Sequence, residues 1–164
     1  MFPFRQAVSS DKEAILRIDA MVTGDTSRAP QLSQAIDSGH CYTIAFDNDV
    51  TGYAVIDQSF FRQTFLSLLV IHPFYRRMGL GDALLQRLEE MCPTEKLFLS
   101  TSLTNTPMQK LCKKRGYVES GSIDNLNPNE PELVFCKQIK MPQSAPAPRP
   151  RHPYLTMSPH MYSY

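Results

Sequence analysis

Arg76-Arg77-Met78-Gly79-Leu80-Gly81 is the stretch that decides the fold of this sequence. An apolar run at residues 66–71 precedes it, and leucines with helical spacing follow it. The order is therefore a strand, a turn at Pro73, a basic loop with two glycines, and a helix. Because glycine has no Cβ, Gly79 and Gly81 let the backbone approach a ligand closely or adopt a positive φ.

A loop of this kind is typical of an anion site, because its backbone N–H groups converge and the helix dipole favours negative charge there. The spacing differs from the G-x-x-x-x-G-K-[ST] and G-x-G-x-x-G phosphate loops. It is R-x-x-G-x-G, beginning at Arg76 and ending at Gly81. Pyrophosphate binding is the chemistry that fits. The alternative is a strand-to-helix turn that the glycines merely allow.

Periodicity along the rest of the chain predicts an α/β fold. Ser10 with Glu13, and Thr106 with Gln109, have the spacing of capping boxes that open helices. Further helices are expected at residues 31–37 and 79–91. Strands are expected at residues 4–8, 40–46, 51–56, 64–71, 96–102, 117–123 and 133–139, the last two joined by a polar loop.

A second segment, at residues 105–117, reads Asn-Thr-Pro-Met-Gln-Lys-Leu-Cys-Lys-Lys-Arg-Gly-Tyr. This segment and the basic loop resemble motifs B and A of the GNAT superfamily of N-acetyltransferases, and the order of elements resembles the GNAT fold. The resemblance implies a mixed central sheet, splayed at the fourth and fifth strands, with helices on both faces. The segments at residues 57–61 and 125–133 resemble a bacterial subgroup of this superfamily whose substrate is uncertain. We expect one GNAT domain at residues 1–140.

The resemblance also implies acetyl-CoA as co-substrate, no metal, and direct transfer of the acetyl group to the primary amine of a small molecule in a ternary complex. Pantetheine would lie where the strand splays, and the Val70 N–H would act as the oxyanion donor. Asn at the start of motif B contacts the cofactor in the family. The implied cofactor-binding residues are Leu69, Val70, Ile71, Arg76, Arg77, Met78, Gly79, Leu80, Gly81, Asp82 and Asn105.

The catalytic acid and base are less defined by the sequence. Cys112 stands where the family usually carries a Tyr that protonates the leaving thiolate. A thiol can donate a proton, but Cys112 also fits a core position, and Tyr117 or water are alternatives. Glu119 is the hypothesis for the base, with Asp57 and Glu132 as other candidates.

Composition bounds the remaining choices. A net charge of +1 over 164 residues argues against a nucleic-acid binder. No apolar run is long enough to span a membrane. The four cysteines show no metal-site spacing and are typical of reduced thiols, so we expect a cytoplasmic protein without a signal peptide. Residues 141–164 are Pro-rich and predict a disordered tail.

Two other functions are consistent with the sequence. One is a protein or peptide N-acetyltransferase, which an open groove would favour over a deep acidic pocket. The other is an acyl-CoA-binding sensor or interaction module without turnover, because the usual Tyr is replaced and no base is obvious. A homodimer through the C-terminal strands is a further hypothesis.

Overall fold

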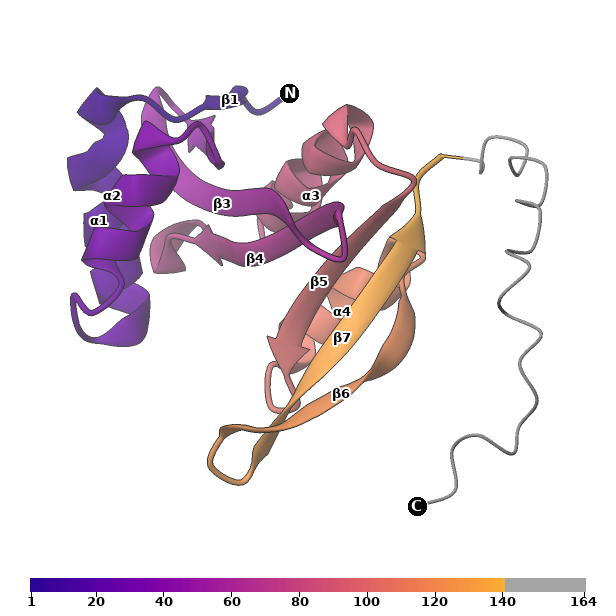
Figure 1. Ribbon diagram of the computed structural model, residues 1–164. Helices are drawn as coiled ribbons and strands as arrows, with labels where there is room; N and C mark the ends of the chain where they lie inside the picture. Colours follow the sequence, from indigo (N-terminus) through magenta and orange to yellow (C-terminus); the bar gives the residue numbers. More distant parts are fainter. Residues whose placement is uncertain (141–164) are drawn as a thin grey trace, which may run out of the picture.

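A single mixed sheet of seven strands, in the order β1-β2-β3-β4-β5-β7-β6, organises the computed structural model, which describes residues 1–140 (Figure 1). The prediction for residues 141–164 lies outside the described residues. The strands are β1 (Phe4–Gln6), β2 (Cys41–Phe46), β3 (Asp49–Phe60), β4 (Gln63–Ile71), β5 (Lys96–Ser102), β6 (Val118–Asn127) and β7 (Glu130–Gln138). The helices are α1 (Lys12–Thr23), α2 (Ala29–Asp37), α3 (Leu80–Met91) and α4 (Thr106–Lys114), with 3-10 turns at Ser9–Asp11 and Pro73–Tyr75.

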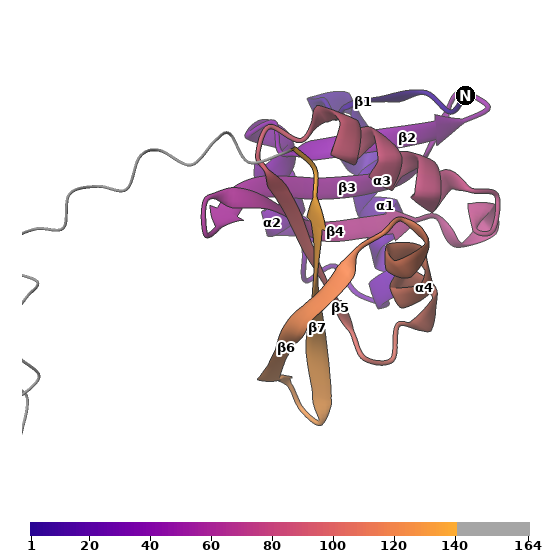
Figure 2. The same ribbon diagram turned by 90° about the vertical axis from the view of Figure 1, so that its right-hand side faces the viewer.

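Helices cover both faces of the sheet, as the sequence predicts. Figure 2 shows α3 and α4 on one face and α1 and α2 on the other. The α3/α4 face packs on residues of β2, β3, β4, β5 and β7, so this core continues across the splay. The α1/α2 face packs on β2, β3 and β4 alone. Beyond β4, the α1/α2 face of the sheet therefore has no helix over it among residues 1–140.

The splay predicted between the fourth and fifth strands is present. β4 and β5 pair in parallel only from Thr64 with Leu97 to Leu66 with Leu99. The next residue, Ser67, is a β-bulge: Ile56 of β3 pairs with Leu66, whereas Val55 pairs with Leu68. A bulge bends its strand and increases the local twist, so β4 turns away from β5 beyond this point.

The local capping predictions are wrong at both helices. Residues 9–11 form a 3-10 turn, so α1 begins at Lys12, and Asp11 rather than Glu13 accepts from a backbone N–H, that of Val8 (2.8 Å). At α4 the N-cap is Asn105, whose Oδ1 accepts from the Met108 N–H (3.2 Å). Gln109 donates to the Leu103 carbonyl instead.

The expected polar loop between the last strands is in fact most of a hairpin. β6 continues to Asn127 and β7 begins at Glu130, so only a tight turn remains. Asn129 in that turn has φ of 60°, a left-handed conformation that Asn tolerates. The polar, turn-forming residues extend well beyond the turn itself, because backbone pairing continues through polar positions. β6 is exposed along its whole length and forms the edge of the sheet.

An ionic network ties the start of α3 to the end of α4. Arg115 donates to Asp82 at the first turn of α3 (2.8 Å) and to Glu89 two turns later (2.6 Å). Lys137 on β7 also donates to Glu89 (3.0 Å), whose side chain is only 9% exposed. Burial raises the pKa of Glu89, but the hydrogen bonds from Arg115 and Lys137 outweigh it, and the net pKa is lowered.

Replacement of Arg115 by Gln is expected to lower the free energy of unfolding by about 2–4 kcal/mol at pH 7, because it leaves Glu89 buried with one cationic partner. A carboxylate with a lowered folded-state pKa contributes stability above its unfolded-state pKa and loses it as pH falls through the folded-state value. The difference between wild type and variant should therefore shrink below about pH 4. Urea unfolding at pH 7 and pH 3.5 measures this, and an equal difference at both values would contradict it.

Candidate active site

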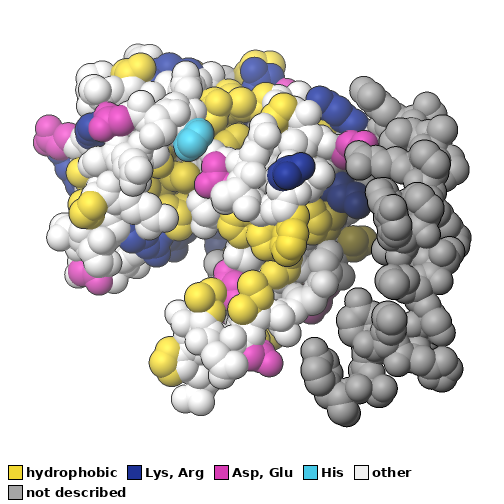
Figure 3. All heavy atoms as spheres, in the orientation of Figure 1, with side chains coloured by type: hydrophobic (Ala, Val, Ile, Leu, Met, Phe, Trp, Pro, Cys, Tyr) yellow, Lys and Arg dark blue, Asp and Glu magenta, His cyan; other side chains and the backbone are white. Residues whose placement is uncertain are grey.

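A cavity of about 270 Å³ occupies the splay between β4 and β5. β4 contributes Leu66 to Val70, and β5 contributes Leu99 to Ser102. The remaining lining comes from α1, the start of α2, the start of α4, and β7: Val22, Arg28, Asn105, Met108 and Glu132. Figure 3 shows a recess between the body that carries α1, α2 and β4 and the projecting β6–β7 hairpin. The cavity thus joins the two faces of the sheet where its backbone ladder is open.

The basic loop presents unpaired donors beside this cavity, on the α3/α4 face. Arg77 and Gly79 have positive φ angles of 63° and 84°. The first backbone bond of α3 runs from the Ala83 N–H to the Gly79 carbonyl (3.0 Å), and no side chain caps the helix. Among the described residues, no acceptor meets the backbone N–H groups at positions 76–82. Free donors at a helix start with left-handed residues form an anion site.

Side chains around the loop leave that site electropositive. The Asp82 carboxylate turns away to Lys114 (2.6 Å) and Arg115, and its hydrogen bonds to them lower its pKa. Arg76 and Arg77 are exposed, and the Arg76 Nε donates to the Ile71 carbonyl (3.3 Å). The loop therefore presents free backbone donors and two exposed arginines, while the charge of the nearby Asp82 is paired with Lys114 and Arg115.

The direction of the N–H groups along β4 follows from one hydrogen bond. The His72 N–H donates to the Thr51 carbonyl of β3 (2.8 Å). Val70 pairs with Tyr53 two residues back in the same register, so its N–H also faces β3. Leu69 and Ile71 alternate with these positions, and their N–H groups therefore face the open side toward β5. Leu69 lines the cavity, and Ile71 lies beside the basic loop.

The carboxylate candidates lie in different places. Glu132 lines the cavity and pairs with Ser102. Its neighbour Leu133 packs into the α3/α4 core, so Glu132 points to the opposite face of the sheet. Glu119 pairs with Phe135, which belongs to the α3/α4 core, and lies exposed on the edge strand beyond β7. Asp57 lines a separate cavity of about 290 Å³.

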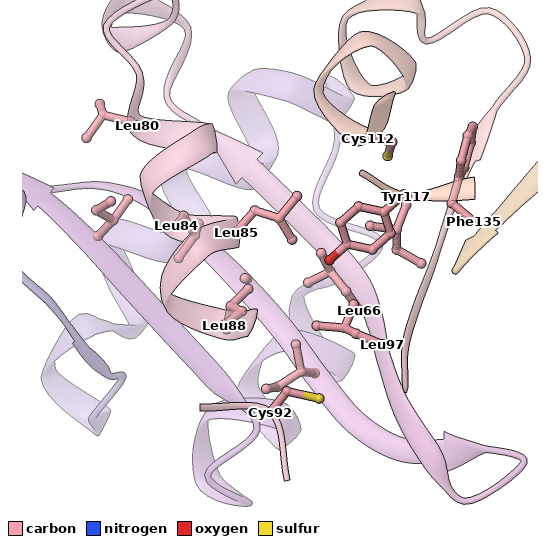
Figure 4. Close-up of a cluster of buried hydrophobic side chains, with 14 of the residues drawn as sticks. Leu66, Leu80, Leu84, Leu85, Leu88, Cys92, Leu97, Cys112, Tyr117 and Phe135 are labelled. Atoms are coloured by element: carbon pink, nitrogen blue, oxygen red, sulfur yellow. The ribbon is translucent and has the colours of Figure 1, made fainter. Parts of the chain in front are cut away.

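Cys112 and Tyr117 lie in the hydrophobic core and not in the cavity lining (Figure 4). Cys112 is fully buried, and burial raises the pKa of its thiol to about 11. Tyr117 is 4% exposed, and burial, with the nearby Glu89 carboxylate, raises the pKa of its hydroxyl. The chain turns at Gly116 in a Schellman motif, in which the backbone N–H of Tyr117 donates to the Cys112 carbonyl (2.9 Å). Both side chains point into the core.

Replacement of Cys112 by Ala is expected to leave turnover unchanged across pH and to lower the free energy of unfolding by about 1–2 kcal/mol, because it removes a buried side chain. The native thiol should also resist alkylation, since a buried thiol with a high pKa forms little thiolate. Steady-state rates from pH 6 to 9 measure turnover, and thermal unfolding measures the loss of stability. A variant that folds but loses turnover would restore Cys112 as the acid.

Arg28 is a cavity residue that the sequence did not single out. It precedes α2 within a segment whose Gly, Asp, Ser and Pro content predicts a loop. The structure places it in the lining of the same cavity as Val22 of α1 and Glu132 of β7. Its only sequence signal is that it is the one arginine between α1 and α2.

Comparison with known proteins gives the family of the chain. A family model described as the acetyltransferase (GNAT) family matches residues 13–117. A GNAT-family acetyltransferase from Bacillus cereus is 36% identical, with 84% of this chain and 97% of that chain covered and a TM-score of 0.81. No protein of curated function matches the chain.

More distant structures share the fold. The ribosomal-protein-S18-alanine N-acetyltransferase of Escherichia coli is 18% identical, with 90% of this chain and 99% of that chain covered and a TM-score of 0.77. The structure of yncA from Salmonella typhimurium with its cofactor acetyl-CoA is also 18% identical, with 90% and 98% covered and a TM-score of 0.73. No helix among residues 1–140 has the length and apolar character needed to cross a membrane. The family match over more than half of the chain, together with 36% identity to the Bacillus cereus protein, shows that this chain belongs to the GNAT family of acetyltransferases.

Proposed function

We propose that this enzyme transfers an acetyl group from acetyl-CoA to the primary amine of a small molecule, by direct attack in a ternary complex. The observation that carries the proposal is the cavity in the splay, which opens beside free backbone donors on the α3/α4 face and has Glu132 on the other face. Such a cavity lets two reactants approach one point from opposite sides of the sheet.

The residues present fit acetyl-CoA, which supplies an activated thioester when bound. The N–H groups at positions 77–82 and the Arg76 side chain would hold the pyrophosphate. The Ile71 N–H would pair with pantetheine. Asn105 uses its Oδ1 to cap α4, and its Nδ2 has no acceptor among the described residues, so it is available for a cofactor carbonyl.

We assign the oxyanion donor to the Leu69 N–H in place of Val70. The register of β4 directs the Val70 N–H to β3, whereas the Leu69 N–H faces the cavity. A donor placed where negative charge develops on the thioester oxygen contributes about 2.7–4 kcal/mol in enzymes from which such a donor was removed.

We assign the general base to Glu132 in place of Glu119, directly or through one water. The amine nitrogen forms a bond to the thioester carbon, and the carbon–sulfur bond breaks as the CoA thiolate leaves. Glu132 takes the proton that the amine loses. The thiolate takes a proton from water, because Cys112 and Tyr117 are buried away from the cavity. The products are the N-acetylated amine and CoA. The four free cysteines fit the reducing cytoplasm in which we place this reaction.

The test is CoA release from acetyl-CoA, measured by thiol detection over a panel of small amines and peptides, with acetyl-CoA binding measured in parallel. Release that depends on a small amine is the expected result. Release that depends only on peptides would replace this proposal with peptide acetylation. Tight binding without release on any acceptor would favour the sensor function instead.

A further inference from the structure

Arg28 brings a fixed positive charge to the acceptor side of the cavity. Val22 precedes it on the same side, three residues after Asp19 on α1, so Asp19 and Val22 share one helix face. The Arg28 Nη1 lies 3.3 Å from the Asp19 Oδ1. Asp19 is 2% exposed and also accepts a hydrogen bond from the fully buried Tyr53 hydroxyl (2.6 Å). The guanidinium is therefore anchored from behind by a buried carboxylate.

The anchor leaves the front of the guanidinium unused. Arg28 is ion-paired with Asp19 through one nitrogen, and within residues 1–140 its other guanidinium nitrogens have no acceptor. Its side chain is 34% exposed, although it lines the cavity. A guanidinium carries five donors in a planar fork that matches a carboxylate. A half-buried fork with free donors that lines a cavity favours an anionic ligand group.

The cavity lining carries one positive and one negative side chain. Glu132 on β7 and Arg28 before α2 line the same small space, and Figure 1 shows α2 and β7 on opposite sides of the splay. A ligand that satisfies both has an amine toward Glu132 and an acid group toward Arg28. The volume of about 270 Å³ suits a small molecule. Val22 adds an apolar surface beside the guanidinium.

We propose that the acceptor is a small amino acid whose carboxylate is bound by Arg28 while its amine faces Glu132. The proposal rests on the function proposed above and names the substrate class of that same site. Asp19 and Tyr53 act as positioning residues that do not line the cavity, since Asp19 holds the guanidinium and the Tyr53 hydroxyl holds Asp19.

The experiment compares α-amino acids with their primary amides, which have the same size but no carboxylate. Rates of CoA release are expressed per neutral amine, because an amide lowers the pKa of the neighbouring amine. The wild-type enzyme should prefer the acid over the amide by roughly 10- to 100-fold in kcat/KM. The preference should arise mainly in KM, because the carboxylate does not react.

Two variants of Arg28 and one control locate the preference. Arg28→Gln should bring the acid-to-amide ratio close to one, and Arg28→Lys should give an intermediate ratio, because it keeps the charge and loses the fork. Arg17→Gln is the matched control, since Arg17 is an exposed arginine on α1 that pairs with Glu13 (2.7 Å), and it should keep the wild-type ratio. Acetyl-CoA affinity reports whether each variant is folded.

A binding measurement separates this inference from the proposed function. With CoA in place of acetyl-CoA no transfer occurs, and an amino acid should still raise the melting temperature of the wild type but not of Arg28→Gln. Amine acetylation with an acid-to-amide ratio of one or less, or a ratio that survives in Arg28→Gln, overturns the inference and keeps the acetyltransferase. Absence of both amino-acid binding and amine-dependent release overturns both.

Discussion

Replacement of Gly81 by Glu is expected to weaken acetyl-CoA binding by about 100- to 1,000-fold while the fold survives. A Cβ at Gly81 would lie 3.8–3.9 Å from side-chain atoms of Ile71, Leu111 and Leu69, so a longer side chain extends toward the space between β4 and α4. A carboxylate there lies beside the proposed pyrophosphate site, and like charges about 4 Å apart near a protein surface repel by roughly 4 kcal/mol. Calorimetry with acetyl-CoA measures the loss.

The fold should survive because the helix gains from the same change. Gly81 lies in the first turn of α3, where an acidic residue interacts favourably with the helix dipole, and Glu has a higher helix propensity than Gly. Gly81→Ala is the matched control, since its Cβ makes only ordinary contacts and adds no charge. A folded Gly81→Glu protein with wild-type affinity would remove the pyrophosphate assignment.

Replacement of Glu132 by Gln is expected to lower kcat/KM by about 10²- to 10⁴-fold at pH 7, because an alkylamine then has no base in the cavity to take its proton. Acetyl-CoA affinity should stay the same, since Glu132 lies on the face opposite the basic loop. The deficit should diminish as pH approaches the pKa of the amine, near 10 for an alkylamine, because the amine then enters already neutral. Initial rates from pH 6.5 to 9.5 measure this profile.

Glu119→Gln is the control for this prediction. It makes the same chemical change on the exposed edge strand, two strands away from β5, and should keep wild-type kinetics. If the Glu119 variant loses activity and the Glu132 variant does not, the base assignment reverts to Glu119. A deficit in Glu132→Gln that is constant over pH indicates a role in binding the acceptor instead.

Several features that depend on neighbouring residues were predictable from the sequence, although the capping boxes expected at Ser10 and Thr106 did not form. The basic loop was, because glycine spacing, a preceding apolar run and a following helix pattern all lie within one short segment. The end of α4 was too, since Gly116 supplies the left-handed residue that a Schellman motif needs. The splay came from the family resemblance, although Ser67, the one polar residue of its run, is the residue at the bulge.

Features that depend on pairing between distant segments were not predictable. Glu119 and Glu132 look alike in sequence, and only the register of β5, β6 and β7 shows which one reaches the cavity. The choice between Val70 and Leu69 likewise needs the alignment of β4 with β3, because a shift of one residue reverses every N–H direction. The role of Arg28 can be inferred only from the structure, which places the buried Asp19 carboxylate of α1 against its guanidinium.

The brief pairing of β4 with β5 has a consequence for the cooperativity of the domain. Three residue pairs join the two parts of the sheet, and on the α1/α2 face no core cluster continues across that junction. The two parts of the sheet are therefore joined mainly by the core on the α3/α4 face. We expect them to separate locally at the mouth of the cavity at a lower free energy than global unfolding. A ligand that contacts both β4 and β5 suppresses this local opening. Substrate binding should thus couple the two parts of the sheet into one cooperative unit.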